Sequence, residues 1–205
     1  MTLTNSVEAA IQRLQQGGLI VVADDQDREG EGDLIAVAEK ITPETVNTMV
    51  TKARGLLCVP MALTEVQRLD LKPMSAEKDA FGTAFLEGTD AKTTTTGVSA
   101  VDRAKTINAL ANSESTKDDF YHPGHIFPLQ ALKGGVLVRN GHTEAAVDLA
   151  RLAGATPVAA IIEILKEDGT MMRRADLQKF AQQEGYPFIT IADLQEYRRQ
   201  QEPAK

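Results

Sequence analysis

A short acidic stretch near the start of the chain, residues 24–33, follows the apolar run Leu19–Val22. Its acidic side chains recur at alternate positions, namely Asp25, Asp27, Glu29, Glu31 and Asp33. Because alternate residues of an extended backbone share one face, this spacing would bring the carboxylates together. Such crowding raises carboxylate pKa values and destabilises a fold unless a cation is bound. Since Arg28 alone cannot neutralise five acids, the pattern predicts a divalent metal with oxygen ligands; a solvent-exposed acidic loop is the alternative.

A second polar segment, Arg139–Glu144, lies between an apolar run and a predicted helix. The first backbone amides of a helix attract anions, so a phosphate group would bind well there. Arg139 would add a charged fork, Gly141 would allow close approach, and Thr143 would add a hydroxyl. A neutral His142 imidazole could bind a metal ion together with the acidic stretch. The alternative is an ordinary helix cap with an exposed histidine.

Two further side chains could transfer protons. Glu163 interrupts the apolar segment Ala159–Leu165, and a buried carboxylate has a raised pKa, which suits a general base near neutral pH. Glu163 could instead face water from an edge strand or belong to a structural ion pair. His125 lies in a polar turn, where a histidine could exchange protons but is a weak signal by itself. Cys58 follows two leucines, which favours a core thiol over a nucleophile.

The bulk properties fit one large domain spanning residues 1–205. Hydrophobic residues make up 42% of the chain and charged residues 25%, which is ordinary for a globular protein with a full core. The net charge of −7 disfavours a nucleic-acid partner. A single cysteine excludes an intrachain disulfide and fits a reducing compartment, so the cytoplasm is the expected location. We expect neither a signal peptide nor a membrane partner, because no apolar run approaches the ~18 residues that span a bilayer.

Periodicity and capping residues predict alternating helices and strands. Helices are expected between Asn5 and Gly17, over 43–54 with Thr42 as its cap, over 64–69, over 100–112 with Ser99 as its cap, over 143–152 and 176–184, and after a cap formed by Thr190 and Asp193. Strands are expected over 19–23, 34–38, 56–60, 126–129, 134–138, 158–165 and 188–191. This alternation favours a three-layer α/β fold, a mixed twisted sheet with helices on both faces. Both polar segments should open at the same end of that sheet, where α/β proteins bind ligands.

Four segments, taken in order, resemble the 3,4-dihydroxy-2-butanone 4-phosphate synthase family of riboflavin biosynthesis. They are Asp24–Asp33, Thr95–Arg103, Pro123–Leu129 and Gly141–Ala145. Each motif is moderately specific, whereas all of them in this order are highly specific. The similarity extends over nearly the whole chain, from Asn5 to Arg199.

The resemblance implies an enzyme that converts D-ribulose 5-phosphate to L-3,4-dihydroxy-2-butanone 4-phosphate and formate, using magnesium, for which manganese could substitute. It implies that Glu29 and His142 hold the metal ion, and that His125 and Glu163 serve catalysis. The substrate contacts that it implies are Arg28, Glu29, Asp33, Arg139, Asn140, Gly141, His142, Thr143 and Glu163. Because the family is typically homodimeric with shared active sites, a homodimer is expected.

The sequence departs from the family pattern in two places. Gly30 replaces an asparagine that is common in the acidic motif, and residues 75–91 differ from the usual run rich in threonine, valine and serine. Many members also carry a fused cyclohydrolase domain with a multi-cysteine zinc site, so a chain with one cysteine resembles the monofunctional members. Another magnesium-dependent sugar-phosphate enzyme and a non-catalytic nucleotide-binding module are the alternative hypotheses.

Overall fold

The computed structural model describes residues 3–76 and 80–201, and a seven-stranded sheet forms its centre. The strands are β1 (Ile20–Ala23), β2 (Gly32–Val37), β3 (Cys58–Met61), β4 (Thr89–Ala91), β5 (Phe120–Gln130), β6 (Ala159–Glu163) and β7 (Phe188–Thr190). They lie in the order β4-β5-β3-β6-β2-β1-β7. The pairs β1/β7 and β3/β5 are parallel and the other neighbours antiparallel, which confirms the predicted mixed sheet.

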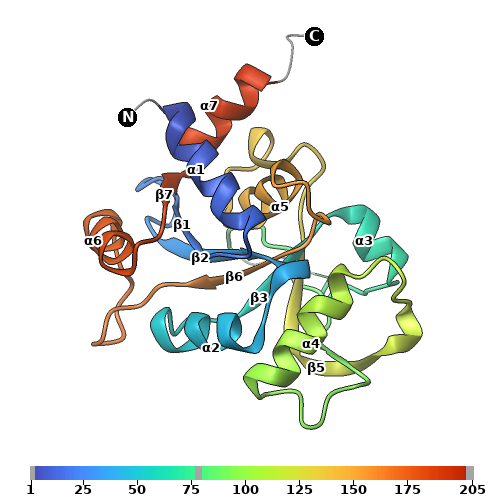
Figure 1. Cartoon of the computed structure of the whole chain (residues 1–205). Helices are drawn as coiled ribbons and strands as arrows, with labels where there is room; N and C mark the ends of the chain where they lie inside the picture. The colour runs from blue at the N-terminus through green and yellow to red at the C-terminus, as the bar shows by residue number, and fades with distance from the viewer. Residues whose placement is uncertain (1–2, 77–79, 202–205) are drawn as a thin grey trace.

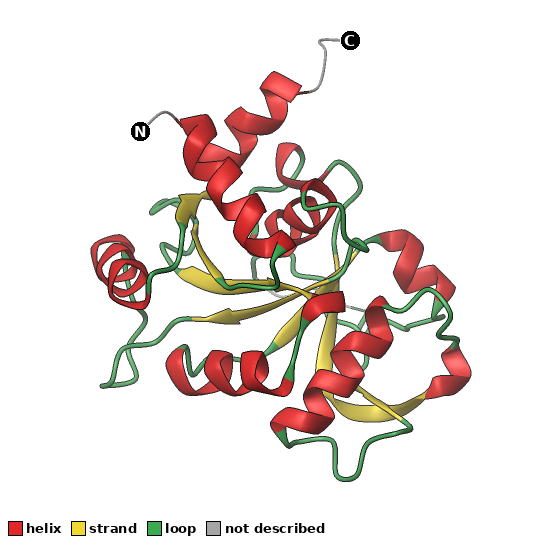
Figure 2. Cartoon of the chain, in the orientation of Figure 1, coloured by secondary structure: helices red, strands yellow, loops and turns green. Residues whose placement is uncertain are grey.

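Helices cover both faces of the sheet, giving the predicted three layers (Figures 1 and 2). One face packs against α1 (Leu3–Gln15), α5 (His142–Leu152) and α7 (Ile191–Gln201). The other packs against α2 (Pro43–Lys52), α3 (Leu63–Arg68), α4 (Ala100–Ala111) and α6 (Arg174–Glu184). Strand side chains alternate between the two cores, since Val21 belongs to one cluster and Val22 to the other. No helix in the described ranges is long and apolar enough to cross a membrane.

Three capping predictions are confirmed. The Thr42 hydroxyl accepts a hydrogen bond from the Thr45 amide at 3.2 Å and starts α2. Ser99 accepts one from the Asp102 amide at 3.1 Å and starts α4. Before α7, the Thr190 hydroxyl accepts a hydrogen bond from the Asp193 amide at 3.1 Å, and the Asp193 carboxylate accepts one from the Thr190 amide at 2.9 Å. These local signals therefore locate helix starts correctly, although α1 begins at Leu3 and not after Asn5.

The expected strand over 134–138 is wrong. Gly134 and Gly135 have φ angles of +101° and +63°, which an extended strand does not allow. The segment instead forms the 3₁₀ helix η3 (Gly135–Leu137), whose Val136 amide donates to Asp148 of α5 at 2.8 Å. A Cβ atom on Gly135 would lie 2.1 Å from that Asp148 carboxylate, so the close approach requires glycine.

The strand around residue 126 is longer than expected, and its partner β4 was not predicted at all. Residues 117–119 form the 3₁₀ helix η2 (Lys117–Asp119), and β5 then runs through the segment of His125, which was expected to be a polar turn. Backbone pairing with β4, at Asp90↔Tyr121 and Ala91↔Phe120, holds this polar part extended. Of the unusual segment 75–91, residues 77–79 lie outside the described residues. A further 3₁₀ turn, η1 (Ala38–Lys40), follows β2.

Candidate active site

The acidic stretch is a compact loop between the antiparallel strands β1 and β2, and not an extended segment. The Arg28 and Gly30 amides both donate to the Asp25 carbonyl, at 3.1 and 3.2 Å, which curls the chain back on itself. The predicted alternation of side chains on one face is therefore wrong. The turn of the loop brings Asp24, Glu29 and Asp33 close to His142. The carboxylates that come together are therefore not the five odd-numbered acids that the spacing predicted.

Asp24, which the spacing argument overlooked, organises this loop. Its buried carboxylate accepts hydrogen bonds from Arg28 Nη1 at 2.9 Å, from the Glu31 amide at 2.9 Å and from the Glu29 amide at 3.3 Å. A buried charge is tolerated when it is paired and hydrogen-bonded in this way. The position directly after a buried strand was the signal that could have identified Asp24.

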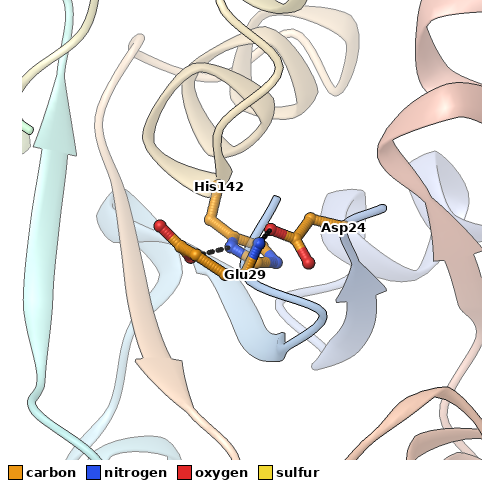
Figure 3. Close-up of side chains that lie close together, drawn as sticks. All are labelled: Asp24, Glu29 and His142. Carbon is orange, nitrogen blue, oxygen red and sulfur yellow. Dashed lines mark hydrogen bonds and ion pairs between the residues drawn. The ribbon is translucent and has the colours of Figure 1, made fainter. Parts of the chain in front are cut away.

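Glu29 and His142 face each other across the loop and the start of α5 (Figure 3). Glu29 Oε2 lies 3.8 Å from His142 Nδ1, and its Oε1 lies 3.0 Å from Arg28 Nη2. Ligand atoms of Asp24, Glu29 and His142 all lie within 4.8 Å of one another. The carboxylate of Asp24 already accepts several hydrogen bonds. The Glu29 carboxylate and the His142 imidazole are therefore more available to bind a metal ion.

A hydrogen bond to the backbone fixes the orientation of the His142 ring. Its Nε2 lies 3.2 Å from the carbonyl oxygen of Val22, which can only accept, so Nε2 carries the proton and donates it. Nδ1 therefore faces the acidic loop. This is the arrangement in which a histidine binds a metal with one nitrogen and anchors the ring with the other.

The electrostatics of the pair favour opposite charges in the absence of a metal. Burial acts to lower the pKa of His142, but Asp33, Glu29 and Asp24 outweigh it and raise that pKa to about 9. For Glu29, burial acts to raise the pKa, and the neighbouring His142 and Arg28 outweigh it and lower it. A divalent cation bound here would replace the imidazolium proton as the positive charge at the centre of the loop.

Asp33 adds a third acid with an unused atom. It is buried on β2, 4.0 Å from His142 Nδ1, and its Oδ1 has no hydrogen-bond partner. Burial raises the pKa of Asp33 to about 7, although His142 opposes the shift. Buried polar atoms are almost always hydrogen-bonded. A ligand group that donates a hydrogen bond at this position would therefore satisfy the Asp33 oxygen.

A cavity of about 320 Å³ opens beside these residues. It is lined by Arg28, Glu29, Glu31, Asp33, Cys58, Phe81, Thr83, Phe85, Leu129, Arg139, His142, Thr143, Ile161 and Glu163. The structure thus brings together seven predicted site residues from the acidic loop, β2, β6 and the start of α5. The size and mixed polarity of this cavity suit a small phosphorylated molecule.

Glu163 ends the central strand β6, directly opposite Asp33 of β2. The alternative of an edge strand is therefore wrong, and the expectation of full burial is also wrong, because the side chain is half-buried and lines the cavity. Its Oε2 accepts a hydrogen bond from the Leu56 amide at 2.8 Å. A Cβ on Gly55 would lie 2.4 Å from that oxygen, so glycine is needed beside it.

Arg139 contributes a positive charge to the lining of the cavity. One arm of its guanidinium pairs with buried Glu144 at 2.5 Å, and the other donates to Thr83 Oγ1 at 3.1 Å. Glu144 is held in turn by the Leu132 amide at 3.0 Å. Gly141 precedes the first residue of α5, and a Cβ there would lie 2.3 Å from Arg139 Nη1. The arginine is thereby fixed beside the helix N-terminus, as an anion site requires.

Three predicted site residues are not among those that line the cavity. Gly141 lies immediately before α5, beside Arg139. Asn140 is exposed and lines a neighbouring hollow with Asp25 and Arg174. His125 lies on β5, outside the lining of the cavity, with its side chain 52% exposed. Within a single chain, the cavity therefore contains the Glu29–His142 pair and Glu163 but lacks His125, the second predicted catalytic group.

Two smaller sequence features also gain an explanation. Gly30 adopts a left-handed φ of +66°, a conformation that asparagine tolerates and glycine adopts without strain, so the family substitution preserves the turn. Its carbonyl and that of Glu29 accept hydrogen bonds from Arg173 Nη1 at 3.1 and 2.7 Å, which tie the loop to α6. Cys58 is buried, and burial raises the pKa of its thiol well above the usual value, so it is no activated nucleophile.

Comparison with known proteins identifies the family of this chain. The model of the 3,4-dihydroxy-2-butanone 4-phosphate synthase family matches residues 8–197. The riboflavin biosynthesis proteins RibBA of Bacillus mycoides and Bacillus cytotoxicus are each 54% identical over 197 residues, covering 96% of this chain and 50% of theirs. The chain therefore spans about half the length of the curated relatives it matches.

Solved structures show the same fold. RibBX of A. baumannii, a two-domain 3,4-dihydroxy-2-butanone 4-phosphate synthase, superposes with a TM-score of 0.93 at 46% identity, over 96% of this chain and 59% of that one. A 3,4-dihydroxy-2-butanone 4-phosphate synthase in complex with two magnesium ions gives a TM-score of 0.88 at 40% identity, over 92% and 94%. With a family match across most of its length and relatives of this similarity, the chain belongs to the 3,4-dihydroxy-2-butanone 4-phosphate synthase family.

Proposed function

We propose that the protein converts D-ribulose 5-phosphate to L-3,4-dihydroxy-2-butanone 4-phosphate and formate, as a magnesium-dependent enzyme of riboflavin biosynthesis in the cytoplasm. The observation that carries this proposal is the single cavity in which the Glu29–His142 pair, Glu163 and Arg139 converge. These side chains match the functional groups of the substrate, which has a carbonyl, neighbouring hydroxyls and a phosphate. The membership of the family supports the same assignment.

Magnesium fits the residues present. Glu29 Oε2 and His142 Nδ1 face each other at 3.8 Å, and Asp33 Oδ1 nearby has no hydrogen-bond partner. Glu29 and His142 would hold the ion, and manganese could replace magnesium because both ions bind carboxylate oxygens. When bound, the divalent ion would supply positive charge that stabilises negative charge developing on the substrate oxygens.

The side chains of this chain supply binding and proton transfer. Arg139, Thr143 and the first amides of α5 bind the phosphate, and Arg28 and Asp33 contact the sugar hydroxyls. Glu163 removes a proton beside the substrate carbonyl; the hydrogen bond from Leu56 holds one carboxylate oxygen in place while the other takes the proton. Later steps that lose a hydroxyl and hydrate a carbonyl need a second proton-transfer group, which is the role we assign to His125.

We propose that His125 comes from the partner in a homodimer. Its imidazole is half-exposed and stands apart from the cavity of its own chain. Two exposed large hydrophobic residues belong to the same region: Val98 follows Gly97, whose backbone approaches His125, and Tyr121 pairs with Asp90, which contacts His125. An apolar surface around a catalytic side chain is what a two-fold interface with a shared site would bury.

A formate assay tests the reaction directly. With ribulose 5-phosphate and Mg²⁺ we expect one formate for each substrate consumed, and no formate after chelation of the metal, because charge on the substrate oxygens is then uncompensated. Formate would be measured with a coupled dehydrogenase and the four-carbon product by mass. Consumption of ribulose 5-phosphate with an isomer or inorganic phosphate as product would contradict the proposal and favour another sugar-phosphate enzyme.

Metal binding should release a proton near neutral pH. The pKa of His142 is raised to about 9 in the metal-free protein, so at pH 7 the ring must lose a proton before Nδ1 can bind the ion. We therefore expect the apparent affinity for Mg²⁺ to rise from pH 7 towards pH 9, by up to about tenfold for each pH unit. Calorimetric titrations in buffers of different ionisation enthalpy would measure the proton count, and a pH-independent affinity would remove His142 from the ligand set.

A further inference from the structure

His125 does not stand alone, because a buried carboxylate holds it by two atoms. Its Nδ1 lies 2.6 Å from Asp90 Oδ2, and its backbone amide donates to Asp90 Oδ1 at 3.0 Å. Asp90 is 7% exposed, whereas the His125 side chain is 52% exposed. One side of the imidazole is therefore fixed inside the protein while the remainder faces outwards.

The backbone around this pair is shaped to permit it. Gly97 has a φ of +81°, and a Cβ there would lie 2.2 Å from Asp90 Oδ2 and 2.6 Å from His125 Nδ1. A Cβ on Gly124 would lie 2.3 Å from the Asp90 amide nitrogen. Any larger residue at either position would force the two partners apart. The contact thus depends on two glycines from separate segments, which distinguishes it from a chance surface ion pair.

Further hydrogen bonds keep the neighbouring turn in place. Asp102 of α4 accepts from the Thr95 hydroxyl at 2.6 Å and from the Gly97 amide at 3.3 Å. Next to Asp90, the Ala91 amide donates to the Thr106 hydroxyl of α4 at 3.0 Å. Helix α4 therefore supports both the strand that carries Asp90 and the turn that covers it.

The contact determines which nitrogen of His125 is free. An ionised carboxylate can only accept, so Oδ2 requires the proton of a neutral imidazole to lie on Nδ1. Nε2 then has its lone pair on the outward side. The same carboxylate stabilises the positive charge that the ring gains when Nε2 takes up a proton, as in other acid–histidine pairs.

We propose that Asp90 is a positioning residue, which fixes the orientation and tautomer of His125 so that Nε2 acts as the acid–base atom of the second catalytic group. This rests on the proposed role of His125. Asp90 contacts His125 and lies outside the lining of the cavity. Its function is exerted entirely through the imidazole, so its loss should affect the rate of the chemical steps and leave the binding of substrate and metal unchanged.

The test is Asp90→Asn in the whole 205-residue chain. The asparagine keeps the shape but can offer an amide donor to Nδ1, which would move the proton to Nε2. We expect kcat for formate release to fall by about 10²–10⁴-fold, with KM and Mg²⁺ affinity changed less than about twofold. Asp119→Asn is the matched control, because it removes the same charge from a hydrogen-bonded carboxylate immediately before β5, outside the site. It should keep normal kcat.

A second measurement does not depend on the folding of any variant. The imidazole nitrogen chemical shifts of His125 in the unaltered protein should show the Nδ1–H tautomer. An Nε2–H tautomer in the unaltered protein, or normal kcat in Asp90→Asn, would overturn the inference. His125→Ala separates this failure from failure of the proposed function: near-normal formate release by that variant would remove His125, and Asp90 with it, from catalysis.

Discussion

Glu29→Gln should abolish formate release while the protein stays folded. The substitution removes the charge that faces His142 Nδ1 at 3.8 Å and leaves one neutral amide in its place, so both metal affinity and stabilisation of the substrate oxygens are lost. We expect kcat/KM to fall by about 10³-fold or more, the scale of losing one preorganised electrostatic group. Formate release and calorimetric titration with Mg²⁺ would measure the two effects separately.

The structure also sets the expected effect on stability. Crowding of acids would suggest that neutralising Glu29 stabilises the fold, but the pKa of Glu29 is lowered, because His142 and Arg28 outweigh burial. A lowered folded-state pKa means that the ionised side chain contributes stability above its unfolded pKa, and that this is lost as pH falls. At neutral pH, Glu29→Gln should therefore lower the free energy of unfolding by less than about 1 kcal/mol. The variant should unfold at a slightly lower denaturant concentration.

Asp27→Asn is the matched control, since it removes one exposed charge from the same loop without touching the Glu29–His142 pair. This variant should keep normal turnover and Mg²⁺ affinity. If Glu29→Gln also kept both, Glu29 would have no place in the metal site, and Asp24 and Asp33 would be the remaining carboxylate candidates.

Two inactive variants should restore activity when they are combined in one dimer. His125→Ala and Glu163→Gln are each expected to be inactive as homodimers, because every site then lacks one proton-transfer group. If His125 serves the partner's cavity, a heterodimer of the two variants has one site with both defects and one intact site. Purified by two different tags, this heterodimer should show about half the normal activity.

The control for this experiment pairs Glu29→Gln with Glu163→Gln. Both residues line the same cavity within one chain, so each site of that heterodimer keeps one defect and should stay inactive. An inactive His125→Ala/Glu163→Gln heterodimer would show that His125 acts within its own chain, and a monomer in solution would contradict the shared site altogether. Light scattering on the same samples reports the oligomeric state.

The sequence could predict much of the local structure and the chemical types of the site. The caps at Thr42, Ser99 and Thr190 are set by side chains within three residues of the amides they bind, so their spacing suffices. The α/β alternation follows from runs long enough to fill a sheet and its covering helices. Four motifs in order identified the family, and the Glu29–His142 pair was predicted through that resemblance.

Contacts between distant residues could not be predicted in this way. The acidic stretch has the spacing of a strand, yet Asp24 curls it through backbone amides that no side-chain pattern displays. Gly134 and Gly135 precede a strand-like apolar run, yet their positive φ angles and the Asp148 carboxylate of α5 turn it into a 3₁₀ helix. In both cases a buried carboxylate satisfied by backbone donors overrides local propensity.

The difference between the features that could and could not be predicted from the sequence therefore has a physical reason. The sequence by itself determined the donors and acids available, the helix starts and the family, because these depend on residue type and on neighbours along the chain. Only the tertiary structure placed Asp90 against His125, across 35 residues, and set His125 outside the cavity that holds Glu163. Burial, the orientation of a ring nitrogen and the distance between two segments arise from packing, and they decide which of the available groups can act together.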